Sequence, residues 1–324
     1  MFWRAIMALD NKKIGYDEVT VRDLKFDLTD MTVNTHWFNN DPWSSHFMTA
    51  VLAVVPEAER WVLRSAREQM EKITNPDIKK AARDFIHQER IHAREHDIMN
   101  AILVKKGLPI DRFENDFKKK RLWFQGKLSV EMQGAIAASF EHFTAVLSSA
   151  FLENPDVFEE TDPEIVSFLF WHFVEETEHK SVSFDVFVEA CGGGSRAYIT
   201  RSIGMILGTA IGASLLFSNL YLLVKEDKQL LNVKSALLMS HSVLIKPAIL
   251  SKMLYHTPRY FLPGFHPWDD DNRLVIQAWK KEYEESGDTR KAFLALKSWV
   301  LGRDNKFSSE KENTSITQQL RAAS

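Results

Sequence analysis

Two Glu-x-x-His pairs are the residues of this chain whose types and spacing could bind metal ions. The first pair is Glu89 and His92, and the second is Glu176 and His179. Residues three positions apart lie on one face of an α-helix, so each pair could hold one ion. One such pair alone would be an ordinary feature of a solvated helix face. Two pairs in one chain indicate a site for two metal ions.

A lone glutamate precedes each pair within an apolar helical segment. Glu59 lies 30 residues before Glu89, and Glu141 lies 35 residues before Glu176. Both separations suit two long antiparallel helices with a short connection. Glu57 is the other candidate in the first segment, and we expect it to face solvent because Glu59 falls on the apolar stripe. Buried carboxylates are costly unless cations compensate them, and two divalent ions would do so.

Further polar residues share these helical faces. His172 lies four positions before Glu176, and we interpret it as a ligand, with a core histidine as the alternative. His96 lies four positions after the first pair, where it could be a ligand, a core residue or, as we favour, a hydrogen-bond partner of a ligand. Glu175 could orient a metal-bound imidazole on the partner helix, and Gln88 could do so only as a neutral amide.

The order of these residues resembles the ligand order of ferritin-like di-iron carboxylate bundles, in which a lone glutamate precedes each Glu-x-x-His pair. The spacing His-x-x-x-Glu-x-x-His from His172 to His179 also resembles the fourth-helix motif of the arylamine N-oxygenases, whose added histidine is a seventh ligand. These resemblances imply two iron ions, with manganese as an alternative, because carboxylate and imidazole ligands suit both metals.

Several longer strings extend the resemblance beyond the metal residues. They are Gln88-Glu-x-x-His-x-x-x-His96, Glu141-His-Phe-Thr-Ala145, Trp171-His-x-x-Glu-Glu-x-Glu-His-Lys180, Phe184-Asp185 and Pro263-Gly-Phe-His-Pro-Trp268. They resemble the bacterial family described as predicted metal-dependent hydrolases, over residues 20 to 285. The family description implies hydrolysis, whereas the ligand order implies chemistry with dioxygen.

Composition limits the class of protein and its compartment. The 324 residues are 45% apolar and 26% charged, as in an ordinary globular protein. A net charge of −3, without a basic stripe carrying aromatic residues, gives no electrostatic case for binding nucleic acid. Cys191 is the only cysteine, which excludes an intramolecular disulfide and suits a reducing cytosol. The first ten residues hold too short an apolar run for a secretory signal, so we expect a cytoplasmic protein.

The periodicity of apolar residues predicts an all-α protein. Four helical segments are expected near residues 43–73, 76–106, 128–153 and 163–190. The charged link 107–127 is expected to be a crossover or a surface loop. The predicted organisation is an N-terminal extension (1–42), a four-helix di-metal bundle (43–192), an apolar helical segment (193–255), a C-terminal helical segment (256–305) and a disordered tail (306–324).

The apolar segment could meet a membrane. Residues Ile203 to Val224 carry no charged side chain, are long enough to cross a bilayer, and include Gly204-x-x-x-Gly208-x-x-x-Gly212, a spacing that allows close helix contact. A shorter apolar stretch, Ser235 to Leu250, is interrupted by Lys246-Pro247. Two alternatives remain: a buried helix pair on the bundle, or a hairpin inserted in the membrane that attaches the protein to the inner face of the cytoplasmic membrane. Basic residues outside both stretches would keep the two ends cytoplasmic: Arg196, Arg201, Lys252 and Arg259.

Three functions compete at this stage. The leading hypothesis is a di-iron oxygenase or oxidase that draws on an external electron donor and oxidises a hydrophobic or lipid-like substrate. The first alternative is a metal-dependent hydrolase in which the ions lower the pKa of a bound water. The second alternative is a non-catalytic protein that stores iron or keeps a structural metal pair.

Overall fold

The computed structural model describes residues 19–28 and 35–302, and every regular element within them is a helix. This confirms the all-α prediction for the described part of the chain. The tail predicted to be disordered, 306–324, lies outside the described residues, as does much of the predicted N-terminal extension.

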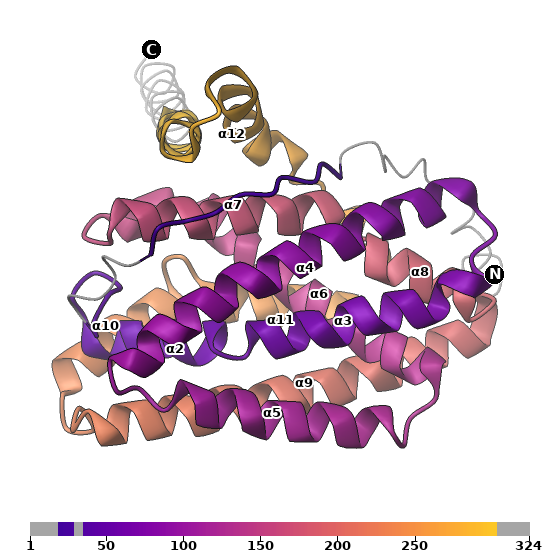
Figure 1. The fold of residues 1–324 in the computed structure, drawn as a ribbon, viewed down its shortest axis with the longest axis horizontal. Coiled ribbons are helices and arrows are strands. Elements are labelled where there is room, and N and C mark those ends of the chain that lie inside the picture. Colours follow the sequence, from indigo (N-terminus) through magenta and orange to yellow (C-terminus); the bar gives the residue numbers. More distant parts are fainter. Residues whose placement is uncertain (1–18, 29–34, 303–324) are drawn as a thin grey trace, which may run out of the picture.

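Four long helices carry the predicted metal residues, and Figure 1 shows where these helices lie in the fold. They are α3 (Val55–Gln69), α4 (Pro76–Lys105), α6 (Val130–Leu152) and α7 (Pro163–His179). The side chain of Asn75 accepts a hydrogen bond from the backbone of Asp77, and that of Asp162 accepts one from Glu164. Each cap precedes a proline in the first helical turn, where the missing N–H has no helical partner to lose. These caps begin two of the expected helical segments, 76–106 and 163–190, where the structure has α4 and α7.

Two of the predicted segments are each divided into two helices. α2 (Pro42–Leu52) ends before α3 because Pro56 cannot donate a hydrogen bond to the preceding turn. α8 (Val182–Ala190) follows α7 after a turn at Lys180 and Ser181. The ammonium of Lys180 donates to the carbonyl of Asp270. The glycines after α8 adopt positive φ angles of 80° at Gly192 and 65° at Gly193, a conformation that ends the helix and that glycine adopts without strain.

The link predicted to be a crossover or a surface loop contains a helix, α5 (Ile110–Gln125). Phe113, Phe117 and Arg121 are buried on one side of it, at a spacing of four residues, against α3 and α4. The surface-loop alternative was wrong because the many charged residues of 107–127 occupy the other face of this helix. An apolar stripe at helical spacing was present among them.

The outer layer of the fold covers α7. Residues 19–28 run in an extended conformation along this helix, and α12 (Arg273–Ser286) lies above it (Figure 1). Phe26, Leu28 and Trp279 are buried in the layer. A further helical stretch, residues 289–302, follows α12.

The helices of the predicted apolar segment pack on the bundle. They are α9 (Gly194–Glu226), α10 (Val233–Leu244) and α11 (Ile249–Arg259), which contact α6 and α2. A Cβ atom on Gly204 would lie 2.5 Å from Ala135 of α6, and one on Gly208 would lie 1.9 Å from the hydroxyl of Ser139. Gly204 and Gly208, the first two glycines of the Gly-x-x-x-Gly-x-x-x-Gly spacing, therefore pack directly against protein.

Three helical stretches are long and apolar enough to cross a membrane by length and composition alone. In α6, 78% of the apolar window is buried inside the protein, so its apolarity serves the core. In α9 the buried share is 33%, and in the stretch Val233–Arg259 it is 17%. Much of the apolar surface of α9 to α11 therefore faces outward.

Candidate metal centre

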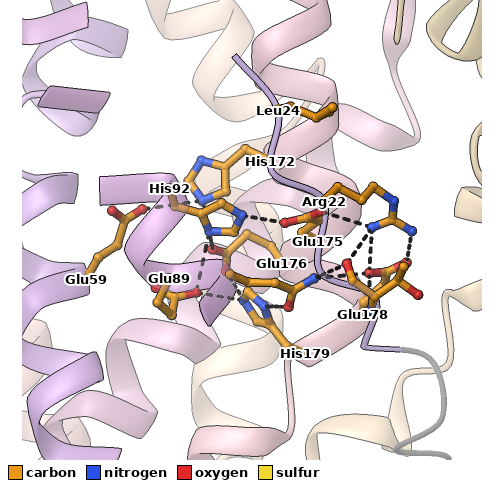
Figure 2. Close-up of polar contacts among 12 residues, drawn as sticks. Arg22, Leu24, Glu59, Glu89, His92, His172, Glu175, Glu176, Glu178 and His179 are labelled. Carbon is orange, nitrogen blue, oxygen red and sulfur yellow. Dashed lines mark hydrogen bonds and ion pairs between the residues drawn. The ribbon is translucent and has the colours of Figure 1, made fainter. Parts of the chain in front are cut away.

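The seven residues predicted as ligands meet in the interior of the bundle, and Figure 2 shows six of them. Each is at most 5% exposed. They form two adjacent groups. Within each group, the candidate ligand atoms lie within 4.8 Å of one another. The first group is Glu59, His92 and His172, and the second is Glu89, Glu141, Glu176 and His179.

Two of the carboxylates lie between the groups. Glu89 Oε1 is 3.5 Å from His92 Nδ1 and 3.2 Å from His179 Nε2. Glu176 is 3.8 Å from His92 Nδ1 through Oε1, and 3.5 Å from His179 Nε2 through Oε2. Glu141 Oε2 approaches only the second histidine, at 3.5 Å. Glu89 and Glu176 thus occupy the positions from which a carboxylate could bridge two ions.

The donor atoms that face this space are the ones left without hydrogen bonds. Both oxygens of Glu59 and of Glu89, Oε2 of Glu141, Nδ1 of His92 and Nε2 of His179 are buried and unpaired among the described residues. A buried carboxylate without a hydrogen-bond partner costs several kcal/mol in principle, and a bound cation would offset this cost. Hard oxygen and borderline nitrogen donors suit two divalent ions, and the residues therefore fit a pair of metals.

The opposite nitrogens of the two paired histidines are held in place. His92 Nε2 lies 3.0 Å from Glu175 Oε2, and His179 Nδ1 lies 2.9 Å from Gln88 Oε1. Each contact fixes a ring so that its free nitrogen faces the carboxylates. Glu175 thus lies where the sequence predicted, and Gln88 takes the same position in the other half as a neutral amide.

A series of close contacts leads from His96 through His172 to the carboxylates of Glu176 and Glu59. His172 Nε2 lies 2.9 Å from Glu176 Oε1 and 3.6 Å from Glu59 Oε1. Its Nδ1 lies 2.8 Å from His96 Nε2. Burial lowers the pKa of both imidazoles, and the charge of His92 lowers that of His172 further. Two neutral rings in this order suit His172 as a ligand and His96 as its hydrogen-bond partner.

The carboxylates differ in their protonation. Burial, and then the charge of Glu89, raises the pKa of Glu59 and of Glu141 well above its usual range. Burial alone would also raise the pKa of Glu176, but His179 and His172 outweigh it and lower this pKa. The raised pKa favours the protonated form of Glu59 and Glu141 without metal, and metal ions would have to displace these protons to bind.

A buried arginine behind the site was not predicted from the sequence. Arg22 lies 3.0 Å from Glu175 Oε1 and 2.8 Å from Glu178 Oε1, and its side chain is 6% exposed (Figure 2). Lys280 contacts Glu178 at 2.9 Å. Burial would lower the pKa of Arg22, but the two carboxylates outweigh it and keep the guanidinium charged. No sequence pattern in residues 19–28 indicates that Arg22 pairs with buried carboxylates, because this pairing depends on how distant segments fold together.

Thr144 is a second residue that the sequence reasoning did not single out. Its hydroxyl donates to Glu176 Oε2 at 2.5 Å, from a position one turn after Glu141 on α6. The contact restrains the oxygen of Glu176 that lies nearer to His179. It was present in the string Glu141-His-Phe-Thr-Ala145, where its spacing from Glu141 was the available signal.

Glu57 is buried, contrary to the expectation that it faces solvent. It is 5% exposed, and its oxygens lie 2.8 Å from Arg121 Nε and 2.8 Å from Arg60 Nη1. The expectation was wrong because Arg121 belongs to α5, the helix that was not predicted. Glu57 thus has cations as partners, whereas the oxygens of Glu59 are unpaired.

A third group of metal-binding residue types lies elsewhere, at the end of α9. His36 Nε2 and His46 Nε2 lie 2.7 and 2.8 Å from the same oxygen of Asp227. Because these two Nε2 atoms and the Asp227 oxygen are hydrogen-bonded to one another, no metal ion is needed to compensate them. We interpret this group as a polar link between the start of the described chain, α2 and α9.

Comparison with known proteins gives one match. A family model described as "predicted metal-dependent hydrolase" matches residues 20–271. No curated protein and no solved structure matches the chain. The matched range includes all seven candidate ligands, Arg22 and the three helices α9 to α11.

Proposed function

The chain belongs to the family of predicted metal-dependent hydrolases, and from this premise we propose that it is an enzyme with a dinuclear metal centre. The observation that carries the proposal is the set of seven buried carboxylate and imidazole atoms that lack hydrogen bonds. They belong to residues that converge from four helices. A cluster of buried carboxylates and imidazoles without hydrogen bonds is costly in a protein interior unless cations bind it.

The proposed ligands divide between the two ions. One ion is held by Glu59, His92 and His172, and the other by Glu141 and His179. Glu89 and Glu176 lie between the groups and are proposed to bridge the ions. The order of these residues along α3, α4, α6 and α7 supports a ferritin-like arrangement of the bundle, within the metal-binding unit 43–192.

Hydrolysis is the reaction that we propose first, because the family is described by it. When bound, two divalent ions would supply an acidified water for attack or, if they are iron, electrons for the reduction of dioxygen. The chain's own part is to fix the donors. Glu175 and Gln88 orient the two paired imidazoles, His96 orients His172, and Thr144 restrains Glu176.

Oxidation with dioxygen is the second candidate, and the donor set favours it. Every proposed ligand is a glutamate or a histidine on a helix, and none is more than 5% exposed. Dioxygen is small and apolar, so it reaches such an interior more readily than a polar substrate does. This candidate requires iron, or manganese as an alternative, together with an external electron donor. The outward apolar surface of α9 to α11 supports a hydrophobic or lipid-like substrate in either case.

The source of the oxygen atom in the product distinguishes the two reactions. Protein loaded with Mn²⁺ or Fe²⁺ would be incubated with carboxylic and phosphoric esters of long-chain alcohols, with and without dioxygen. We expect hydrolysis without dioxygen, with ¹⁸O entering the product from labelled water. Glu141→Gln, which alters a proposed ligand, should abolish it. Turnover that requires dioxygen and takes ¹⁸O from labelled dioxygen would contradict hydrolysis and support the second candidate.

A further inference from the structure

Exposed large apolar side chains gather in one part of the chain. Of the 22 found among the described residues, 16 lie between residues 199 and 262. We call the exposed side chains of residues 199–262 the α9–α11 surface. Its most exposed members include Leu231 at 92%, Phe217 at 69% and Leu254 at 67%. A large apolar patch on a soluble protein marks an interaction site.

The helices of the α9–α11 surface pack on the same two helices of the protein, α2 and α6. α9 contacts α2 and α6, α10 contacts α2 and α11, and α11 contacts α6. α9 follows the edge of the molecule opposite to α12 (Figure 1). The surface is therefore separate from the layer formed by α12 on α7.

The same part of the chain is basic, although the whole chain has a net charge of −3. Residues 228–268 contain no aspartate or glutamate, and they contain five lysines and arginines. Lys246 and Lys252 pair with Asp156 and Glu153 of the bundle. The other three are Lys228, Lys234 and Arg259. Over the whole of residues 199–262 there are seven lysines and arginines against two acidic residues, Glu226 and Asp227. An apolar surface with such an excess of basic residues is complementary to anionic lipid headgroups.

Two tyrosines of the α9–α11 surface each have a positively charged side chain beside the ring. The guanidinium of Arg259 lies 5.1 Å from the ring of Tyr255, and the ammonium of Lys225 lies 5.7 Å from the ring of Tyr221. Both tyrosines are more than half exposed. Tyrosine with a neighbouring lysine or arginine is typical of the boundary between lipid headgroups and acyl chains.

The packing of these helices argues against a span. α9 would have to leave α6, where Gly204 and Gly208 allow backbone contact that a larger residue would prevent. α10 has 12 residues and α11 has 11, whereas a crossing helix needs about 20. A helix that lies in the plane of the headgroups needs only one apolar face.

The charge argues against a second copy of this chain as the occupant. A two-fold dimer brings the same patch of both copies together. It would place the basic residues of 228–268 opposite one another, which disfavours association. A negatively charged partner is favoured instead.

We propose that the α9–α11 surface docks on an anionic lipid bilayer, with the helices lying in the headgroup boundary. Docking would bring to the bilayer a crevice lined by His142, Lys180, His256 and Arg259, since the last two belong to α11. His142 and Lys180 directly follow the proposed ligands Glu141 and His179 in the chain. A substrate drawn from the bilayer would follow from this placement; that step rests on the proposed function, whereas docking does not.

Flotation with vesicles tests the docking directly. Full-length protein would be mixed with vesicles of phosphatidylcholine, or of an equimolar mixture of phosphatidylcholine and phosphatidylglycerol. We expect the protein to float with the mixed vesicles, to float less with phosphatidylcholine alone, and to be released from the mixed vesicles by salt, which screens the charges.

Substitutions separate the apolar from the electrostatic contribution. Leu237→Glu with Leu254→Glu should lower the partition coefficient at least about tenfold, because two apolar side chains no longer enter the boundary. Leu274→Glu with Leu294→Glu is the matched control, since these leucines are 61% and 60% exposed but lie outside the surface. Lys228→Glu with Lys234→Glu should weaken binding to the mixed vesicles by at least about 25-fold, at about fivefold for each cation.

Three outcomes would overturn the proposal. The first is no flotation with either kind of vesicle. The second is resistance of vesicle-bound protein to extraction with alkaline carbonate, which would indicate a span. The third is a dimer in solution that Leu237→Glu with Leu254→Glu dissociates, without any effect of these substitutions on flotation. Because no metal or activity enters the assay, failure of the proposed reaction would leave its result unchanged.

Discussion

Glu59→Gln is expected to lower the affinity for at least one metal ion by about 100-fold or more, while Glu57→Gln leaves both ions bound. The two glutamates lie two residues apart on α3, and each is 5% exposed. They differ in their partners, because Glu57 contacts Arg121 and Arg60 whereas both oxygens of Glu59 are unpaired. The pair of variants is therefore matched in burial, helix and chemistry.

Their effects on stability should also be opposite in the metal-free protein. Glu57→Gln leaves the buried guanidinium of Arg121 without a full negative charge, which should cost about 2–3 kcal/mol of unfolding free energy. Glu59→Gln removes an unpaired buried acid and should leave this free energy unchanged or increased. Metal analysis and urea denaturation of both variants check the prediction. Two ions retained in Glu59→Gln, or an ion lost from Glu57→Gln, would refute the assignment of Glu59.

Arg22→Met is expected to destabilise the protein by about 3–5 kcal/mol, the usual cost of leaving a buried charge without its partner. Glu175 and Glu178 would both lose the guanidinium, which would leave Glu175 with the imidazole of His92 and Glu178 with the ammonium of Lys280. Metal affinity should fall as well, because Glu175 would no longer be held where it orients His92. Urea denaturation with and without metal measures both effects.

An exposed ion pair supplies the control for Arg22. Arg290→Met removes a pair with Glu164 in which the arginine side chain is 59% exposed, and it should cost less than about 1 kcal/mol. Combining Arg22→Met with Glu178→Gln should recover part of the loss, since it removes a buried carboxylate that has lost one of its two cationic partners. Equal costs for Arg22→Met and Arg290→Met would show that Arg22 does not stabilise the buried carboxylates.

The sequence predicted those parts of the site that depend on local spacing. The two Glu-x-x-His pairs, His172 and His96 lie at three- and four-residue intervals, which a helix alone places on one face. The caps at Asn75 and Asp162 are likewise local signals. For these residues, knowing that a segment is helical was enough to predict which side chains meet.

The parts that could not be predicted depend on contacts between distant segments. Arg22 lies 153 residues from Glu175 in the chain, and no residue pattern near Arg22 predicts that the two side chains pair. Glu57 was expected in solvent because its partner Arg121 was assigned to a loop. The burial of one face of α9 was equally hidden, since Ile203 to Val224 is apolar on all sides and periodicity distinguishes no face.

The central claim is that the interior of the bundle binds two metal ions. The most direct test is an anaerobic calorimetric titration of the metal-free, full-length protein with Fe²⁺ or Mn²⁺, in buffers of different ionisation enthalpy. We expect saturation at two ions per chain with release of protons, because Glu59 and Glu141 have a raised pKa and are protonated before metal binds. Affinity should therefore fall as the pH is lowered. A chain that binds no ion, or that binds two ions equally well after replacement of both Glu59 and Glu141 by alanine, would contradict the claim.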